Sequence, residues 1–536
     1  MGNCNLQVSI GLVIDLFWVM QGSALAFEPD APFRALQEKQ AATWSEEDGK
    51  IDKKLAALKA RFGKTPNIIY ILTDDVGWGE LGWQGGGKHR GVPTPELDRM
   101  AFEGMRFWTA YSEPSCTPTR VAINTGRHPV RTGLTSVLWP GAKEGLSPEE
   151  VGVAQVLSDA GYSTAMWGKW HMGDFEEHSP ERHGYDYAYY GLFNGAVDGW
   201  PTAYDFYKKN MPQPTTPAWY DFPGNEKYKD ITGIDINIAG YVGEKGKGRK
   251  PIEGAAGVPG VGREEAFEKE SIKQILAYVH DKAISDKPFF IYWAPYAQQV
   301  HGSEEYKNAP FVDHANAQAS FMAMHSAQVG RLLETLKKEG IAENTLVVWW
   351  SDNGPMYGFW PTSGYSWLKG GKGAVTEGGV RVPAMAWWPG MIAPDQDPVD
   401  MIHVTDLYTT AARLAGALGK MPSDRVIDGI DQTALLIDGE GHGRRNYIFY
   451  YSGENLAAVR WMDIKAIVKG GSHGGLPGLD ICNVVRDPGE QFCSMYPYLW
   501  AVTPFQNLVK THFDLIKAFP NRKPEIPEEA ALTPHD

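Results

Sequence analysis

The stretch Asn67–Ile68–Ile69–Tyr70–Ile71–Leu72–Thr73–Asp74–Asp75 decides the fold of this 536-residue chain. Its first six residues form a short, almost wholly apolar run, which is typical of a parallel strand that is buried on both faces. The run leads directly into two adjacent carboxylates. In open α/β sheets, binding sites form beyond the carboxyl ends of such strands.

The same arrangement recurs along the chain. Further strands are predicted at 162–167, 288–293, 345–350 and 382–388, and helices at 94–104, 147–161 and 318–338. Ser147–Pro148–Glu149–Glu150 has the form of a capping box, which predicts that the second helix begins there. This alternation predicts an α/β fold in which helices sandwich a large mixed, mostly parallel sheet.

The chain divides into four parts by composition and pattern. We expect a signal segment at 1–26, a helical extension at 27–63, a large α/β domain at 64–440 and a small C-terminal antiparallel-sheet subdomain with a tail at 441–536. Residues 195–265 are rich in Gly, Pro, Tyr and Lys and show little periodicity. They are predicted to be an insertion near the mouth of a site, where selectivity often resides.

The net charge is −14, which argues against nucleic acid or an anionic membrane as the main partner. An acidic protein that binds an anionic substrate must build a local cationic pocket.

The N-terminal segment is largely apolar and ends in Ala24–Leu25–Ala26, a cleavage-like site, although Asp15 interrupts it. It is short for a membrane span, so we expect no stable membrane insertion. A periplasmic or secreted location follows if the segment is a signal. The alternative is an N-terminal helix packed on the domain, with a cytoplasmic location.

Four cysteines are too few for a disulfide scaffold. Cys4 would leave with a cleaved signal, and Cys482 and Cys493 could either pair or remain free thiols. Cys116 stands apart, because it opens Cys116–Thr117–Pro118–Thr119–Arg120, followed by Thr125–Gly126–Arg127. Pro118 suits the first turn of a short helix that ends near Gly126, and a helix N-terminus favours anions. An ordinary buried cysteine would not require Pro and Arg at these spacings.

Oxygen and nitrogen donors gather at the predicted strand ends. Asp74 and Asp75 follow one strand and Asp352 and Asn353 follow another, a donor set that favours a hard cation such as Ca²⁺ or Mg²⁺. Taken singly, each pair also reads as a turn.

A third strand leads into Gly168–Lys169–Trp170–His171. In an extended segment, Lys169 and His171 point the same way, so that one could bind an anion and the other exchange a proton.

Taken together, these motifs resemble the type I sulfatases, which are arylsulfatase-like members of the alkaline-phosphatase-like superfamily. The resemblance spans roughly residues 64–490 and includes three framework segments, Thr94–Arg99, Val329–Leu333 and Asp487–Glu490. It implies that a formylglycine-generating enzyme oxidises Cys116 to formylglycine, whose hydrated aldehyde offers one hydroxyl to attack sulfur and a second to help expel the product. It also implies a cation, usually Ca²⁺ with Mg²⁺ as the alternative, that is held by Asp74, Asp75, Asp352 and Asn353 and touches residue 116.

The resemblance assigns roles to the remaining polar residues. Arg120, Lys169 and Lys372 would neutralise the transferring group, His301 with Lys372 would protonate the departing oxygen, and His171 would take a proton from the second hydroxyl. Lys372 follows Gly370–Gly371, and Lys369 is its nearby competitor.

The chain departs from the family pattern at three places. Thr119 stands where Ser is commoner, Glu80 replaces the usual Asp, and a longer run separates Pro295 from His301.

The function that we expect is hydrolysis of small-molecule sulfate monoesters, with an aryl, alkyl or sugar leaving group. One alternative is a phosphonate monoester or phosphate diester hydrolase on the same scaffold. Another is a non-catalytic carbohydrate-binding protein, which should have lost some of the site residues. The predicted tail helix at 503–519 could serve as a contact in a homo-oligomer.

Overall fold

The computed structural model describes residues 27–139, 142–193, 240–257, 263–296, 302–314, 316–359, 364–468, 479–524 and 526. The expected signal segment at 1–26, most of the segment 195–265 and His301 lie outside these residues. Among the described residues, no helix combines the length and the apolar character needed to cross a membrane.

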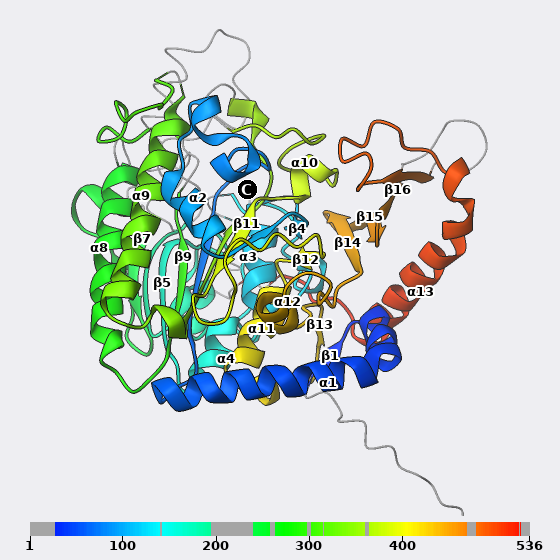
Figure 1. Ribbon diagram of the computed structural model, residues 1–536, viewed down its shortest axis with the longest axis horizontal. Helices are drawn as coiled ribbons and strands as arrows, with labels where there is room; N and C mark the ends of the chain where they lie inside the picture. The colour runs from blue at the N-terminus through cyan, green and yellow to red at the C-terminus, as the bar shows by residue number, and fades with distance from the viewer. Residues whose placement is uncertain are drawn as a thin grey trace, which may run out of the picture.

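A mixed sheet of nine strands, counted over the described ranges, forms the centre of the α/β part (Figure 1). The middle strands β10, β2, β9, β5 and β6 run parallel, and the strands at both edges are antiparallel, as expected for a mixed sheet. In spatial order the strands are β3 (Met105–Phe107), β11 (Ala384–Trp387), β10 (Thr345–Ser351), β2 (Asn67–Thr73), β9 (Phe289–Ala294), β5 (Ser163–Lys169), β6 (Tyr187–Gly191), β7 (Gly240–Glu244) and β8 (Gly248–Pro251).

The apolar run that decides the fold serves two cores at once. On β2, Ile68, Tyr70 and Leu72 pack in one hydrophobic core, and Ile69 and Ile71 pack in the core on the opposite face. Successive side chains of a strand point to opposite faces, so a strand that is covered on both sides must be apolar throughout.

Helices cover both faces of the sheet. One face carries α2 (Pro95–Phe102), α8 (Arg263–Ala283) and α9 (Ala317–Lys338), and the other carries α3 (Cys116–Thr125), α4 (Val153–Asp159) and α11 (Asp406–Leu414). Shorter helices are α10 (Glu377–Val380) and α12 (Thr433–Asp438). The long α1 (Ala31–Phe62), drawn in blue in Figure 1, contacts α12 and α13 (Val502–Ala518).

One predicted helix start is wrong. The helix expected from Ser147 begins at Val153, after Gly152 as its N-cap. Ser147 instead starts a turn, in which its carbonyl accepts a hydrogen bond from the Glu150 amide. The Glu150 carboxylate does not reach back to cap a helix, because it lies 2.5 Å from Arg127 Nη1 in a buried ion pair.

The described part of the segment 195–265 contains regular structure. Residues 240–251 form the hairpin β7–β8, which extends the large sheet from β6. Glycine-rich strands such as Gly240–Glu244 carry little hydrophobic periodicity, which is why the sequence pattern missed them.

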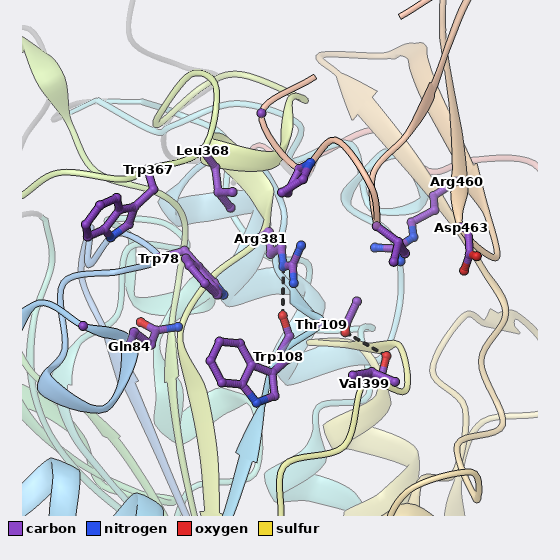
Figure 2. A pocket seen from close by; sticks show the side chains of 14 residues that line it. Trp78, Gln84, Trp108, Thr109, Trp367, Leu368, Arg381, Val399, Arg460 and Asp463 are labelled. Atoms are coloured by element: carbon purple, nitrogen blue, oxygen red, sulfur yellow. Dashed lines mark hydrogen bonds between the residues drawn. The ribbon is translucent and has the colours of Figure 1, made fainter. Parts of the chain in front are cut away.

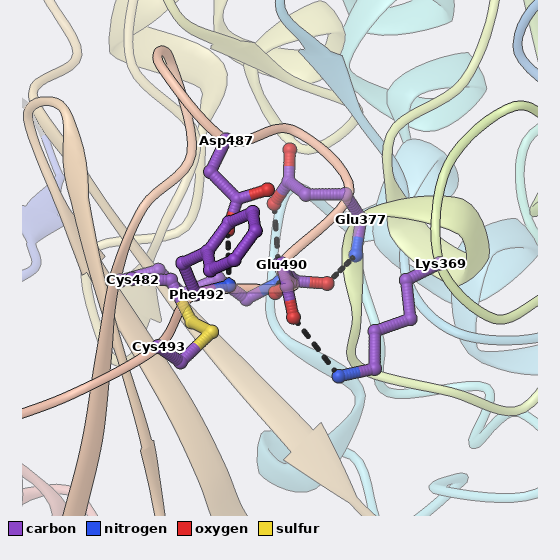
Figure 3. Close-up of a disulfide and its surroundings, with 8 residues drawn as sticks. Lys369, Glu377, Cys482, Asp487, Glu490, Phe492 and Cys493 are labelled. Atoms are coloured by element: carbon purple, nitrogen blue, oxygen red, sulfur yellow. Dashed lines mark hydrogen bonds and ion pairs between the residues drawn. A yellow bond between two sulfur atoms is a disulfide. The ribbon is translucent and has the colours of Figure 1, made fainter.

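The C-terminal part is a four-stranded antiparallel sheet of β14 (Tyr447–Ser452), β15 (Asn455–Trp461), β16 (Ile464–Val468) and β17 (Leu479–Asn483). The expected antiparallel subdomain is thus confirmed, and α13 packs beside β15. Cys482 and Cys493, whose pairing the sequence left open, form a disulfide with a Cα–Cα distance of 4.3 Å (Figure 3).

Replacing both Cys482 and Cys493 with Ser should lower the stability of the folded chain. The disulfide closes a loop of sequence separation 11. A crosslink across a loop of this length destabilises the unfolded chain, relative to the folded chain, by about 3 kcal/mol. The thermal midpoints of the wild type and the double variant, measured under oxidising conditions, would show the loss. Equal midpoints would contradict a stabilising crosslink.

Candidate active site

Two neighbouring parallel strands deliver the acidic residues to one place. β2 and β10 pair in parallel with Thr73 opposite Ser351, so the residues that follow each strand emerge side by side. The Asp75 amide donates to Asp352 Oδ1 at 3.0 Å, and Asn353 Nδ2 donates to Asp75 Oδ1 at 2.6 Å. Ligand atoms of Asp74, Asp75, Asp352 and Cys116 all lie within 4.8 Å of one another, and all four side chains are buried.

Cys116 is the first residue of α3, and its thiol points into this acidic cluster. The helix has the predicted length, because Gly126 ends it in a left-handed conformation with φ of 67°. Cys116 Sγ lies 3.5 Å from Asp74 Oδ1 and 2.8 Å from Lys372 Nζ. An anion placed beside Sγ would therefore also face the free amides at the N-terminus of a ten-residue helix.

Three buried cations balance the carboxylates. Arg120 Nη2 lies 2.8 Å from Asp352 Oδ2 and 3.2 Å from Asp74 Oδ1, and Lys169 Nζ lies 2.6 Å from the same Asp74 oxygen. Lys372 Nζ donates to both carboxylate oxygens of Asp75, at 2.7 and 2.9 Å. The structure thus brings together every predicted cation and carboxylate of the site.

The charges in this cluster shift one another's protonation. Burial opposes ionisation of Asp74, but Lys169, Lys372 and Arg120 together hold the pKa of that carboxyl well below its usual range. Burial and the adjacent charge of Asp74 raise the pKa of Asp352. Burial and the Asp352 carboxylate also raise the pKa of the Cys116 thiol, which therefore stays protonated near neutral pH.

The donor set fits a hard cation. Asn353 Oδ1 is buried and has no hydrogen-bond partner, although the amide nitrogen of the same side chain is fully used. An orphaned buried carbonyl oxygen is costly unless something else coordinates it. Together with the oxygens of Asp74, Asp75 and Asp352, it completes an oxygen-only set that suits Ca²⁺ or Mg²⁺.

His171 lies near enough to the cluster to feel the charges of Lys169, Arg120 and Asp74, but the sequence did not predict how its ring is oriented. Its backbone is left-handed, with φ of 56°, so simple alternation along an extended segment does not orient it. His171 Nε2 lies 2.8 Å from the Leu138 carbonyl and must donate to it, which leaves the buried Nδ1 as an acceptor without a partner. Burial and the charge of Lys169 hold the pKa of His171 well below its usual range, so the ring is neutral.

A residue of the C-terminal subdomain, Glu490, holds the loop that carries Lys372. Glu490, which lies inside the disulfide loop, accepts a hydrogen bond from the Glu377 amide at the start of α10 at 2.8 Å (Figure 3). Its carbonyl accepts from Lys369 Nζ at 3.0 Å. Lys369 is therefore turned toward the subdomain, and Lys372 is the lysine that faces Cys116.

A second buried group of potential ligands was missed by sequence analysis. Glu113, His128 and His403 bring their ligand atoms within 4.8 Å, and His128 Nδ1 lies 2.9 Å from Glu113 Oε1. No motif marks them, because they come from three separate segments. Glu113 and Thr119 hydrogen-bond each other, so this group supports the Cys116 loop from behind.

Thr119 and Glu80, the two residues that depart from the expected pattern, both make hydrogen bonds. Thr119 Oγ1 donates to the Asp352 carbonyl at 2.5 Å, which any hydroxyl residue could do. Glu80 accepts from the amides of Gly77 at 2.7 Å and Tyr365 at 2.9 Å, and so joins the loop after β2 to the loop before Lys372.

Comparisons with known proteins agree with this geometry. The Sulfatase family model matches residues 66–417. N-acetylgalactosamine-6-sulfatase of Rattus norvegicus is 32% identical over 428 residues, covering 77% of this chain and 73% of the relative. Arylsulfatase A of Homo sapiens is 33% identical over 467 residues, covering 80% and 83%. Among solved structures, PsFucS1 sulfatase from Pseudoalteromonas sp. superposes with a TM-score of 0.80 at 31% identity, covering 90% and 96%.

Replacing Glu80 with Gln should flatten the pH dependence of stability. Burial raises the pKa of Glu80 to about 7, above its ordinary 4.5, so the folded state binds a proton that the unfolded state has lost between these values. The contribution of Glu80 to the free energy of unfolding of the wild type should therefore fall by up to about 3 kcal/mol as the pH rises from 4.5 to above 7.

Unfolding free energies of the wild type and Glu80→Gln between pH 4 and pH 8 would measure this. The advantage of the wild type over the variant should shrink as the pH rises. A constant difference would show that Glu80 does not titrate in this range.

Proposed function

The chain belongs to the sulfatase family and is a sulfuric ester hydrolase, and we propose that it acts through a formylglycine made from Cys116 and a bound divalent cation. The observation that carries this proposal is the position of the Cys116 thiol. It is buried at the first residue of α3, 2.8 Å from Lys372 Nζ and within reach of Asp74. Because its pKa is raised, it would be a poor nucleophile as a thiol, and oxidation to an aldehyde removes this obstacle.

When formed, the hydrated aldehyde supplies two hydroxyls on one carbon, one for attack on sulfur and one for release of the product. The chain's own residues prepare the site around it. Arg120, Lys169 and Lys372 surround the position of the thiol and would contact the sulfate oxygens, where negative charge is rearranged during transfer. These cations are already fixed by Asp74, Asp75 and Asp352, so they need no reorganisation during the reaction.

The cation would be held by Asp74, Asp75, Asp352 and Asn353, and we propose Ca²⁺, with Mg²⁺ as the alternative. When bound, it supplies further positive charge to polarise the sulfate group. Oxygen ligands from two adjacent strand ends and the absence of histidine from this set favour a hard ion over zinc.

Proton transfers are assigned to His171, Lys372 and His301. His171 is neutral with Nδ1 as a buried acceptor, so it can take a proton from the second hydroxyl. Lys372 stays protonated, because Asp75 raises its pKa despite burial, and it can donate toward the leaving oxygen. His301 lies outside the described residues, and its part in protonating the leaving group remains a proposal from the sequence.

We further propose that the leaving group is a sugar. This is supported by the 32% identity to N-acetylgalactosamine-6-sulfatase over most of the chain. A periplasmic or secreted location is supported by the Cys482–Cys493 disulfide, because such bonds persist in oxidising compartments. Maturation would require a formylglycine-generating enzyme.

The proteolytic peptide that contains Cys116 should have the mass of the aldehyde in active protein. Cys116→Ala should lower the hydrolysis of 4-nitrophenyl sulfate by at least about a thousandfold, because it removes the nucleophile while the electrostatic site remains. An unmodified thiol in fully active protein would refute the proposal. Rates on matched sulfate and phosphate esters would then test the alternative of a phosphonate monoester or phosphate diester hydrolase.

Calcium should raise the thermal midpoint of the protein relative to a chelator, and the rise should be larger at pH 8 than at pH 5. The carboxylates must be ionised to bind the ion, and the pKa of Asp352 is raised. Asp352→Asn should remove most of the rise.

Asp395→Asn is the matched control, because Asp395 is an exposed carboxylate paired with Arg106 at 2.7 Å. A calcium response that survives in Asp352→Asn, or disappears equally in Asp395→Asn, would contradict the assigned ligands.

A further inference from the structure

A cavity of about 670 Å³ opens between the α/β part and the C-terminal subdomain (Figure 2). Trp78, Trp108 and Trp367 line one side, and Arg460 and Asp463 line the other. Val485 also lines the cavity. The volume lies within the range of about 300–1,000 Å³ that is typical of small-molecule sites.

The walls of this cavity come from the loops that carry the reacting groups. Trp78 follows Asp75 by three residues, and Trp367 precedes Lys372 by five. The two loops are joined where Trp367 Nε1 donates to the Gly79 carbonyl at 3.3 Å. The cavity is therefore built on the same scaffold as the catalytic centre, although none of the catalytic side chains lines it.

The aromatic wall suits a sugar ring. Trp78 and Trp108 have ring centroids 5.7 Å apart and are inclined by 50°, and Figure 2 shows both at the cavity. Trp367 is 58% exposed, so its indole contributes little to a hydrophobic core and is open to a ligand. A pyranose presents a flat face of C–H bonds that packs on an indole, and its hydroxyls remain available to polar groups at the edge.

The charged groups make the cavity cationic. Arg381 lies over the ring of Trp78 at 5.3 Å and donates through Nε to the Trp108 carbonyl, while its nearest carboxylate oxygen, on Glu377, is 3.8 Å away. Arg460 uses its donors on the Met462 carbonyl and the Tyr111 hydroxyl rather than on a carboxylate.

Burial lowers the pKa of Arg381 and lowers that of Arg460 to about 10, although the charges of Glu377 and Asp463 oppose the respective shifts. Asp463 is the one carboxylate among the residues that line the cavity, against two arginines. Planar guanidinium groups are suited to sulfate and carboxylate oxygens.

We propose that this cavity is a saccharide-binding site that takes an anionic sugar unit, sulfated or carboxylated, away from the catalytic centre. The ligand class rests on the proposed action on sugar sulfates. A second contact of this kind would retain a polymeric substrate between turnovers, because two linked contacts bind more tightly than either alone.

The test is equilibrium binding of a chondroitin 6-sulfate tetrasaccharide and a κ-carrageenan tetrasaccharide, measured by calorimetry in the inactive Cys116→Ala background. Trp367→Ala and Val485→Glu should each raise the Kd of the better ligand about tenfold, through lost stacking and through repulsion of the anion. Val485 is 57% exposed, so the second variant tests the cavity without disturbing the core.

Two controls carry the same substitutions elsewhere. Trp500→Ala replaces a tryptophan that is 64% exposed, and Val468→Glu places a charge at a valine that is 53% exposed; neither residue lines the cavity. Both should leave the Kd within about twofold of the background. In the Cys116-containing protein, Val485→Glu, which leaves the loops that carry Asp75 and Lys372 untouched, should lower kcat/KM for the saccharide through KM and by more than it lowers kcat/KM for 4-nitrophenyl sulfate.

The outcomes separate this proposal from the proposed function. If 4-nitrophenyl sulfate is hydrolysed but neither saccharide binds, or the cavity variants bind like the controls, the saccharide site is wrong and the function stands. If binding depends on the cavity but no sulfate ester is cleaved, the function is wrong and the site stands.

Discussion

The mutual neutralisation of buried charges at the carboxyl edge of the large sheet is the constraint on which the rest of the structure depends. Asp74, Asp75 and Asp352 lie in a volume that also holds Arg120, Lys169 and Lys372, and all six side chains are largely shielded from water. Removing one partner would leave an uncompensated buried charge, which costs several kcal/mol. The parallel register of β2 and β10 makes the arrangement possible, because it sets Asp74–Asp75 and Asp352–Asn353 side by side where the two strands end.

The same constraint explains why the small C-terminal sheet is part of the site. Lys372 must be presented to Asp75 and Cys116 by a glycine-rich loop that has little structure of its own. Glu490 caps the helix that follows this loop, and Lys465 bridges Glu377 and Glu490 at 3.1 Å to each. The subdomain therefore fixes the Lys372 loop through a buried ion network, and the disulfide closes the segment that carries Glu490.

The sequence predicted what is local or set by strand periodicity. The strands at β2 and β10, the helix from Cys116 to Gly126 and the convergence of Asp74, Lys169 and Asp352 follow from apolar runs and from the rule that strand ends share an edge. It could not predict contacts that depend on tertiary placement. Glu150 pairs with Arg127 instead of capping a helix, and a left-handed backbone orients His171. The group of Glu113, His128 and His403 and the wall of tryptophans come from segments with no shared motif, so only the folded chain brings them together.

The charged cluster and the cavity lie on parts of the fold with different tolerance to change. The charged cluster sits on strand ends, where a one-residue shift would move every side chain to the other face. The cavity is lined by side chains from loops and from the subdomain, such as Trp367 and Val485, which are more than half exposed and carry no buried charge. Trp367 and Val485 can be exchanged without leaving a carboxylate or a cation uncompensated. A scaffold of this kind can therefore keep its charged cluster while the exposed side chains of the cavity vary, because exchanging them leaves no buried charge uncompensated.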